Sequence, residues 1–464
     1  MHLDTILRQN RVVAVADMAY GDSGKGKVTH RLASSKNVRI VVRSGGGPNT
    51  GATIFDNNGQ DYKLHLIPVS AIIKDKINVV TGEVLFDVNV FNDELRMLKE
   101  RGHQLDSNSL VVDFNLPVIM PYGIAFDISR EISSKIGTTC RGVGPTVEDF
   151  VNRYNSIRLN DLFDKNKLEE KLELILGLAQ LIIDWNFRTN GSTKKQQSGI
   201  LIEKKLEKYL NNNGDFSAKK IAEILSSEAE NVKPFVKDAR HFLLEKYRKG
   251  DHMVLEGTQG YHLDVLHGLN PFTTSSPVTP NGILYTSGLP QLDYLFYVVK
   301  AIPTKVGSGP LPTEVLGKEA DTIRNIANEF GATTGRPRRI FWPDLIMYKD
   351  AMASAPVKRA LVINKLDIAL GMTIKVYDTY ARRDDLNNKN NYRTEWSRYA
   401  REISNYVGVN PREFGSIEDI SGINDLRDLK RTPNAGRYIV YLQESLDTNV
   451  IMVGKGPKAY DTIE

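Results

Sequence analysis

Two glycine-rich segments near the start of the chain have the composition of phosphate-binding loops. The first, Gly21–Lys27 (GDSGKGK), follows the β-branched run Arg11–Asp17 and has the GxxxxGK spacing, although Val28 stands where serine or threonine is usual. Glycines let backbone N–H groups converge on phosphate oxygens, and a following helix N-terminus adds positive potential. The second, Gly45–Thr53 (GGGPNTGAT), has three successive glycines that allow close backbone approach to a ligand.

Three later segments also combine glycines with polar side chains. Ile136–Asp149 (IGTTCRGVGPTVED) has two hydroxyls and an arginine, which suit an anion. Glu256–Gly260 (EGTQG) places a glutamine between glycines, where its amide could read a base edge. Gly331–Arg339 (GATTGRPRR) has three arginines, and guanidinium groups bind carboxylates in a bidentate way. Taken alone, each segment also fits an ordinary turn or surface loop.

The segment Asn364–Asp367 (NKLD) follows the apolar run RALVI and has the NKxD pattern of guanine recognition. Its aspartate would accept hydrogen bonds from N1–H and the 2-amino group of guanine, both of which adenine lacks. Four residues alone are a weak signal. A phosphate loop upstream and a preceding strand strengthen it.

The elements that must position these segments alternate between strands and helices. Apolar runs at 11–17, 38–43, 77–80, 109–112, 252–257, 294–302, 359–363 and 373–380 predict buried strands, and several contain or precede one of the glycine-rich segments. Apolar residues at helical spacing predict a helical insertion at about 160–250. We therefore expect an α/β fold, with a large, mainly parallel central sheet flanked by helices, and one domain spanning 1–464.

Composition excludes several classes of protein. The chain has 464 residues and one cysteine, Cys140, so a disulfide framework and a cysteine-based zinc site are excluded. The 61 basic and 56 acidic residues give a net charge of +5, too small a bias to indicate nucleic acid. No stretch approaches the length of a membrane span, and the N-terminus does not resemble a secretory signal. We expect a cytoplasmic enzyme that binds small anionic molecules.

Together, these motifs identify a resemblance to the adenylosuccinate synthetase family. It runs from about Val12 to Pro457 and also includes LHLIP (64–68) and TKVGSGPLPTE (304–314). The resemblance implies a carbon–nitrogen ligase of purine biosynthesis that uses GTP, IMP and L-aspartate with Mg²⁺. GTP phosphorylates O6 of the purine, and the aspartate amine then displaces the phosphate.

The resemblance assigns roles to particular residues. Catalytic residues would be Asp22, Lys25 and Gln259, and the metal ligands would be the Asp22 carboxylate and the Gly51 carbonyl. The purine nucleotide would contact Asn49, Thr139, Arg153, Gln259, Thr274, Val306 and Arg336. GTP would contact Gly24, Lys25, Gly26, Lys27, Lys365, Asp367 and Gly456, and aspartate would contact Thr333, Thr334 and Arg338. Arg153 matches an arginine that reaches the neighbouring subunit's site, which implies a homodimer.

The chain departs from the family pattern beside the reacting purine edge. The family reads GDEGKGK and GGHNAGHT, whereas this chain has Ser23, Pro48 and Ala52 at the glutamate and the two histidines. The second histidine is the family's general acid, and alanine cannot donate a proton. Three hypotheses follow: ligation to IMP or a related 6-oxopurine nucleotide, the same chemistry on GMP or dGMP giving a 2-aminoadenylosuccinate, or a non-catalytic purine nucleotide-binding paralogue. Smaller residues at 23 and 52 would leave room for a 2-amino group.

Overall fold

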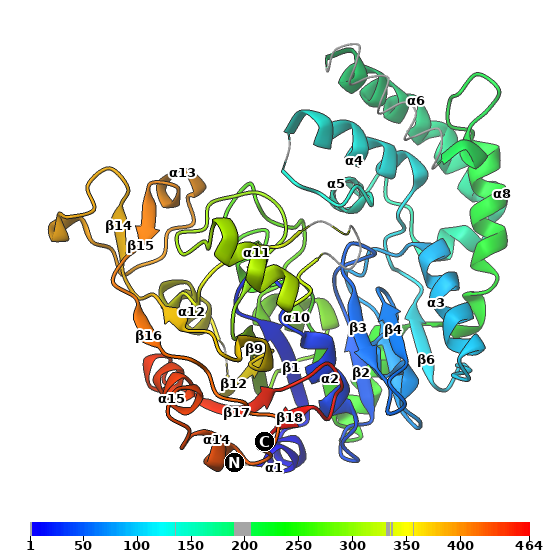
Figure 1. Cartoon of the computed structure of the whole chain (residues 1–464). Coiled ribbons are helices and arrows are strands. Elements are labelled where there is room, and N and C mark those ends of the chain that lie inside the picture. Colours follow the sequence, from blue (N-terminus) through cyan, green and yellow to red (C-terminus); the bar gives the residue numbers. More distant parts are fainter. Residues whose placement is uncertain (1, 135, 190–205, 331–334, 336, 356) are drawn as a thin grey trace.

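The computed structural model describes residues 2–134, 136–189, 206–330, 335, 337–355 and 357–464. Its largest element is a ten-stranded sheet (Figure 1). The strands are β1 (Val12–Asp17), β2 (Ile40–Arg43), β5 (Ile77–Val80), β6 (Leu110–Asp113), β7 (Val236–Lys237), β8 (Met253–Glu256), β9 (Tyr294–Lys300), β12 (Arg359–Asn364), β17 (Asn449–Gly454) and β18 (Thr462–Ile463).

The strand order is β18-β17-β12-β9-β1-β8-β2-β5-β6-β7, and every neighbouring pair is parallel except β17 with β18. The predicted fold class, a large and mainly parallel sheet flanked by helices, is confirmed. The β-branched runs form these strands because a parallel sheet covered on both faces buries every residue of a strand. All six residues of β1 are buried.

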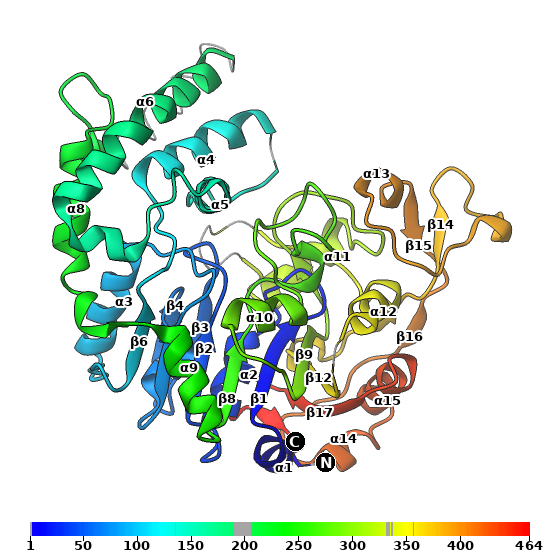
Figure 2. The same ribbon diagram turned by 180° about the vertical axis from the view of Figure 1, so that it is seen from behind.

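Helices cover both faces of the sheet, as Figures 1 and 2 show from opposite sides. The helices of the described residues are α1 (Leu3–Gln9), α2 (Lys25–Ala33), α3 (Val88–Glu100), α4 (Pro121–Ser134), α5 (Val143–Asn152), α6 (Lys165–Thr189), α8 (Ala218–Ala229), α9 (Ala239–Arg248), α10 (Pro280–Ser287), α11 (Gly317–Ile326), α12 (Leu345–Ala353), α13 (Ala400–Ile403), α14 (Leu426–Leu429) and α15 (Ala435–Ser445). Short 3-10 turns are η1 (Val69–Ile72), η2 (Leu159–Phe163), η3 (Glu207–Tyr209), η4 (Lys233–Phe235), η5 (Tyr261–Leu263), η6 (Asp367–Ala369) and η7 (Lys389–Asn391).

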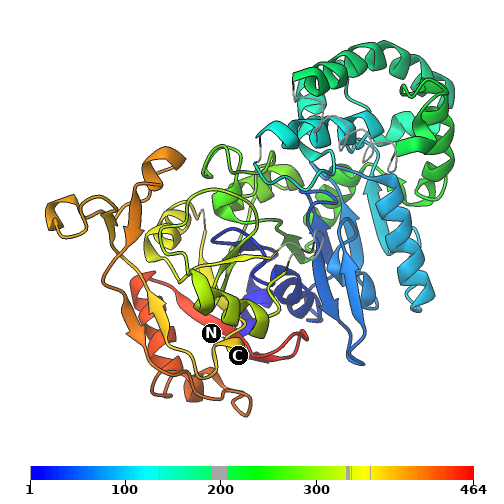
Figure 3. The same ribbon diagram turned by 45° about the horizontal axis from the view of Figure 1, so that its top comes forward.

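Alternate residues of β1 belong to two different cores. Val13 and Val15 pack with α1 and α2 on one face. Val12, Ala14 and Ala16 belong to a larger core on the other face, to which α9, α10, α12 and α15 contribute. A third core joins α3, α4, α6 and α8 with β6, and Figure 3 shows these helices gathered at one end of the molecule.

The helices α6, α8 and α9 lie within the region 160–250, where a helical insertion is predicted; residues 190–205 of that region lie outside the described residues. The assignment of the chain to a single domain stays a prediction. In the part of the chain that the structure describes, no helix combines the length and apolar composition needed to cross a membrane.

In the part of the chain that the structure describes, four two-stranded antiparallel sheets lie outside the large sheet. They pair β3 (Ala52–Phe55) with β4 (Asp61–Leu64), β10 (Thr304–Lys305) with β11 (Arg339–Ile340), β13 (Ile374–Val376) with β16 (Arg412–Phe414), and β14 (Tyr380–Arg382) with β15 (Tyr406–Gly408). The run 373–380, predicted as one strand, is therefore two. It is interrupted at Tyr377, whose N–H donates to Pro343 and whose carbonyl accepts from Leu345.

Candidate active site

The glycine-rich segments follow the carboxyl ends of neighbouring parallel strands. The phosphate loop follows β1, and the second glycine loop follows β2. EGTQG begins at the last residue of β8, and NKLD begins at the last residue of β12. The loop after β17, which contains Gly456 and Asp461, is called the tail loop. Because these strands are parallel, their carboxyl ends share one edge of the sheet, where such folds bind ligands. The fold thus brings together segments that are hundreds of residues apart.

The phosphate loop turns sharply before α2 begins at Lys25. Gly21, Asp22 and Gly24 all have left-handed backbone conformations, with φ of 85°, 58° and 84°. Lys25 is 9% exposed and its ammonium donates to the carbonyl of Gln259. Lys25 therefore contacts the EGTQG segment, whereas Lys27 contacts the C-terminal segment of the chain.

Lys27 joins the phosphate loop to the tail of the chain. Its ammonium donates to the carbonyls of Gly456 at 2.7 Å and Asp461 at 2.8 Å. Burial lowers the pKa of Lys27 to about 8, against the opposing effect of Asp461 and Asp367. Lys27 thus contacts Gly456, another residue predicted to bind GTP, and the charge of Asp367, a third such residue, acts on the same cation.

Asp22, the predicted base, forms an ion pair with Arg338 of the predicted aspartate loop. The Asp22 carboxylate lies 2.8 Å from Nε of Arg338, and the Asp22 side chain is 36% exposed. A second nitrogen of Arg338 lies 2.5 Å from the Glu329 carboxylate. The structure therefore places these two predicted site residues side by side. Thr333, Thr334 and Arg336 lie outside the described residues.

Glu329 is a buried carboxylate at the centre of this cluster, and the sequence did not single it out. It lies 2.8 Å from the ammonium of Lys300 and 2.5 Å from that of Lys365, besides Arg338. Burial alone would raise its pKa, but these three cations lower it to about 2. The available signals were the NEFGATTGRPRR segment and the lysine that ends the apolar strand β9.

Several polar atoms predicted to contact ligands are buried without protein partners. Among the described residues, both polar atoms of the Gln259 amide, Oδ1 of Asn49 and Oδ1 of Asp367 have no hydrogen-bond partner. Burial raises the pKa of Asp367. Buried polar groups in folded proteins nearly always have partners, so each exception needs an explanation. A bound ligand would supply these partners.

Several predicted contacts of the purine nucleotide come from segments that lie against one another. A side-chain carbon added at Gly137, two residues before Thr139, would lie 3.1 Å from Gly307, the neighbour of Val306. One added at Gly144 would lie 3.6 Å from the hydroxyl of Ser275, the neighbour of Thr274. Thr139, Val306 and Thr274 therefore belong to adjoining loops.

The second glycine loop lies against the phosphate loop. A side-chain carbon added at Gly26 would lie 2.7 Å from the methyl group of Ala52, so glycine is required for this close approach. This contact brings Gly51 towards the phosphate loop. The Asp22 carboxylate and the Gly51 carbonyl are hard oxygen donors, which suit Mg²⁺ with further oxygens from phosphates. Within the described residues, no cluster of three or more His, Cys, Asp or Glu offers another metal site.

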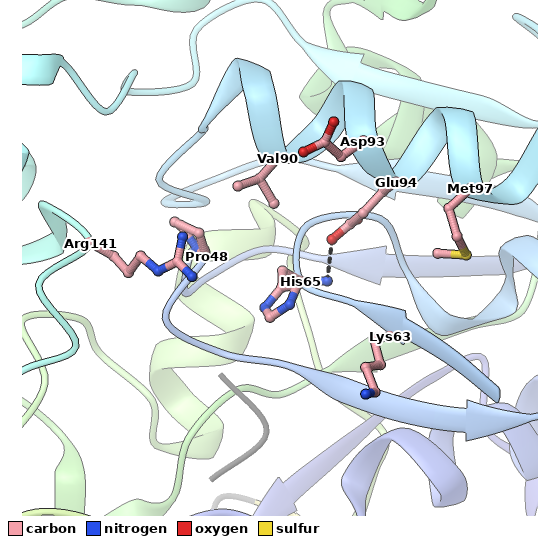
Figure 4. A pocket seen from close by; sticks show the side chains of 8 residues that line it. All are labelled: Pro48, Lys63, His65, Val90, Asp93, Glu94, Met97 and Arg141. Atoms are coloured by element: carbon pink, nitrogen blue, oxygen red, sulfur yellow. Dashed lines mark hydrogen bonds between the residues drawn. The ribbon is translucent and has the colours of Figure 1, made fainter. Parts of the chain in front are cut away.

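A cavity of about 340 Å³ opens beside the second glycine loop (Figure 4). It is lined by Pro48, Lys63, His65, Val90, Asp93, Glu94, Met97 and Arg141. Glu94 accepts the backbone N–H groups of His65, Leu66 and Ile67, and burial raises its pKa to about 7. His65 in turn contacts the carbonyl of Thr50 at 2.8 Å. Glu94 thus supports the LHLIP segment, which supports the glycine loop.

Two of the sequence-derived residues have side chains that face solvent or a different protein partner. Arg153, the residue that follows α5, is exposed, and its guanidinium lies 5.7 Å from the centre of the Tyr154 ring. The small side chain of Ser23 is predicted from the sequence to leave extra room in the purine pocket. Its side chain is 3% exposed and its hydroxyl donates to Asp17 instead.

Comparison with known proteins agrees with this arrangement. The family model for adenylosuccinate synthetase matches residues 14–463. Adenylosuccinate synthetases from Halothermothrix orenii and Listeria monocytogenes are each 32% identical to this chain, over 458 and 457 residues, with 97% of both chains covered.

Solved structures show the same fold. Fully ligated adenylosuccinate synthetase from Plasmodium falciparum matches with a TM-score of 0.83 at 23% identity, over 98% of this chain and 99% of that one. Succinoaminodeoxyadenylate synthetase of cyanophage S-2L, bound to dGMP and to dATP as an energy donor, matches with a TM-score of 0.57 at 15% identity, over 98% and 95%. The chain belongs to the adenylosuccinate synthetase family.

Proposed function

We propose that this chain is a GTP-dependent ligase that joins L-aspartate to C6 of IMP or a related 6-oxopurine nucleotide through a 6-phosphoryl intermediate. Family membership supports the ligase chemistry, since adenylosuccinate synthetases are carbon–nitrogen ligases of purine biosynthesis. The observation that supports this chain's own substrates is the set of buried polar atoms without partners. Gln259, Asn49 and Asp367 lie at the positions assigned to the purine base, the nucleotide phosphate and guanine.

The proposed chemistry makes a poor leaving group into a good one. Asp22 removes the N1 proton of the purine, so that O6 attacks the γ-phosphorus of GTP, the bond from that phosphorus to the β–γ bridging oxygen breaks, and GDP leaves. Lys25, held at the N-terminus of α2, faces the transferred phosphoryl group. The aspartate amine then attacks C6 and phosphate leaves with O6. Mg²⁺, which Asp22 and the Gly51 carbonyl would hold, offsets negative charge on the phosphates.

The ion pair between Asp22 and Arg338 suggests that binding of the aspartate substrate frees the Asp22 carboxylate to act as the base. Arg338 pairs with Asp22 and Glu329 in the protein alone. A substrate carboxylate that binds Arg338 competes with Asp22 for the guanidinium. Aspartate binding would thus leave the Asp22 carboxylate freer to accept a proton and to bind the metal.

A guanine nucleotide is the second candidate substrate, and Ala52 is the observation that favours it. With Ser23 directed at Asp17, the case for a wider purine pocket rests on Ala52 and Pro48. An assay of phosphate release from GTP, with aspartate and IMP, GMP, dGMP or XMP, separates the candidates. We expect IMP to give the highest kcat/KM. A preference for GMP or dGMP would replace this substrate assignment, and no release with any nucleotide would favour a non-catalytic binding protein.

Ala52→His should restore a proton donor near O6. Loss of one such donor typically costs about 10²–10³ in kcat, so we expect the change to raise kcat on the preferred nucleotide at least tenfold if proton donation limits turnover. Ala52→Gln, which is larger but not an acid, is the control. Equal kcat for all three proteins would show that another group already serves this role.

Asp367→Asn should weaken GTP without a comparable effect on ATP. Asparagine loses the charge that receives two hydrogen bonds from guanine, a loss of about 1–3 kcal/mol for hydrogen bonds to a charged group. Steady-state KM values for GTP and ATP measure the change, and ATP is the internal control. Equal use of GTP and ATP by the unmodified protein would refute guanine recognition.

Arg153 supports the proposal of a homodimer with shared sites, since it is exposed directly after α5, where it is free to contact a neighbouring subunit. Arg153→Leu and Asp22→Asn should each be inactive alone. Mixed after subunit exchange, they should recover about a quarter of wild-type activity, because random pairing of a two-fold dimer leaves that share of sites intact. Absence of recovery in dimers verified by native mass spectrometry would contradict shared sites.

A further inference from the structure

Asp17, the last residue of β1, is a buried carboxylate to which the proposed mechanism gives no role. It is 1% exposed, and a buried charge is costly unless neighbouring groups donate to it. Its Oδ1 accepts the backbone N–H groups of Ala19 at 2.7 Å and Gly21 at 3.2 Å. Its Oδ2 accepts the hydroxyl of Ser23 and lies 3.7 Å from the ammonium of Lys25. All four groups belong to the phosphate loop or to the turn that leads into it.

Other contacts fix the same loop from different directions. The side-chain amide of Asn364 donates to the carbonyls of Ser23 at 2.7 Å and Gly24 at 3.2 Å. The ammonium of Lys25 donates to the Gln259 carbonyl while it faces Asp17. A lysine side chain has many rotamers, so holding it in one of them costs conformational entropy. Because these contacts form when the protein folds, that cost is already met before the reaction begins.

We propose that Asp17 is a positioning residue that holds the ammonium group of Lys25 in place for phosphoryl transfer. The hydrogen bond from the Ser23 hydroxyl to Asp17 would keep the phosphate loop next to this carboxylate. Asp17 would replace, from the end of β1, the carboxylate that the GDEGKGK pattern has at position 23. The inference rests on the proposed function, because it acts through Lys25. The contact between Ser23 and Asp17 also explains why a small hydroxyl residue suits position 23, since a longer side chain would collide with the Asp17 carboxylate.

Asp17→Asn keeps the shape of the side chain and removes its charge. A misplaced catalytic group costs up to about 10²-fold in rate, so we expect kcat to fall about 10–100-fold. The KM for GTP should stay within about threefold, because the loop keeps its backbone N–H groups and its lysine. Ser23→Ala, which removes one donor to Asp17, should lower kcat in the same direction by less.

Asp113→Asn is a matched control. Asp113 ends β6, four strands from β1 in the sheet, and is also a buried carboxylate that accepts two backbone N–H groups and a hydroxyl, from Asn115, Ala239 and Thr81. It should show a comparable loss of thermal stability with unchanged kcat. A fall in kcat as large as that of Asp17→Asn would show a merely structural role and overturn the proposal.

Relocating the carboxylate provides the closing experiment. Asp17→Ala should lose activity, and the double variant Asp17→Ala with Ser23→Glu should recover at least tenfold. In parallel, acetylation of Lys25 is followed by mass spectrometry, because this readout does not depend on turnover. We expect faster Lys25 labelling in Asp17→Asn than in the wild type or in Asp113→Asn. Unchanged Lys25 labelling would overturn the Asp17 inference, whereas changed labelling in a protein that never cleaves GTP would overturn only the proposed function.

Discussion

Replacing Asp22 with asparagine should lower kcat by about 10²–10⁴-fold, the usual contribution of a general base. The asparagine amide cannot accept the N1 proton, and it is a weaker metal ligand than a carboxylate. Its φ of 58° should not prevent folding, because asparagine tolerates the left-handed region well. Phosphate release from GTP in the presence of aspartate and IMP measures the loss, and circular dichroism checks the fold.

Asp75→Asn is the control for Asp22→Asn. Asp75 is also an exposed aspartate with a left-handed backbone, at φ 62°, but it precedes β5 and lies outside the site. Its replacement should leave kcat unchanged. If Asp22→Asn kept more than about a tenth of wild-type kcat, far above the loss expected for a general base, Asp22 would not be the base.

Glu329→Gln should have the largest effect on stability. Removing one partner of a buried ion pair typically costs about 3–5 kcal/mol, because the remaining charges stay buried and unpaired. Glutamine would leave Lys300, Lys365 and Arg338 without their shared anion. For a chain of 464 residues the unfolding entropy converts this cost into a fall in Tm of about 3–5 °C. Differential scanning calorimetry measures it.

The pH dependence of unfolding gives a second readout for Glu329. Its folded-state pKa is depressed to about 2, so its ion pairs stabilise the protein above the unfolded pKa near 4.5 and that stability is lost as the pH falls towards 2. The free energy of unfolding should therefore decrease less between pH 4.5 and pH 2 in Glu329→Gln than in the wild type. Glu314→Gln breaks the partly exposed pair with Arg339 and should cost at most about 1 kcal/mol. An equal effect of both changes would contradict the central role of Glu329.

The sequence predicted the sheet well because its strands are short apolar runs bounded by glycine loops. Such runs need both faces covered, and β1, β2, β5 and β8 are fully buried. The run 373–380 was predicted wrongly as one strand, since periodicity does not reveal that Tyr377 pairs with a loop more than thirty residues upstream.

The predicted site residues were found from local patterns, whereas their supports depend on distant contacts. Glu329 is surrounded by cations from β9, NKLD and the arginine loop, which only the folded chain brings together. Asp17 looked like the polar end of an apolar strand. Its contacts with the phosphate loop depend on the left-handed turns at Gly21 and Asp22, which residue types alone do not fix.

Ser23 shows that the partner of a small polar side chain cannot be predicted from its residue type. From the sequence, its small size beside Asp22 suggested room for a larger purine. In the structure its hydroxyl points at Asp17. The structure therefore links the serine at position 23 to the supporting contacts of the phosphate loop.

The fate of the purine O6 atom tests the central claim most directly. IMP labelled with oxygen-18 at C6 is incubated with the protein, GTP, L-aspartate and Mg²⁺, and the phosphate released is analysed by mass spectrometry. If O6 attacks the γ-phosphorus and leaves as phosphate, each phosphate released carries one oxygen-18 atom and the nucleotide product carries none at C6. Phosphate without the label, or label retained in the nucleotide, would contradict the proposed 6-phosphoryl intermediate.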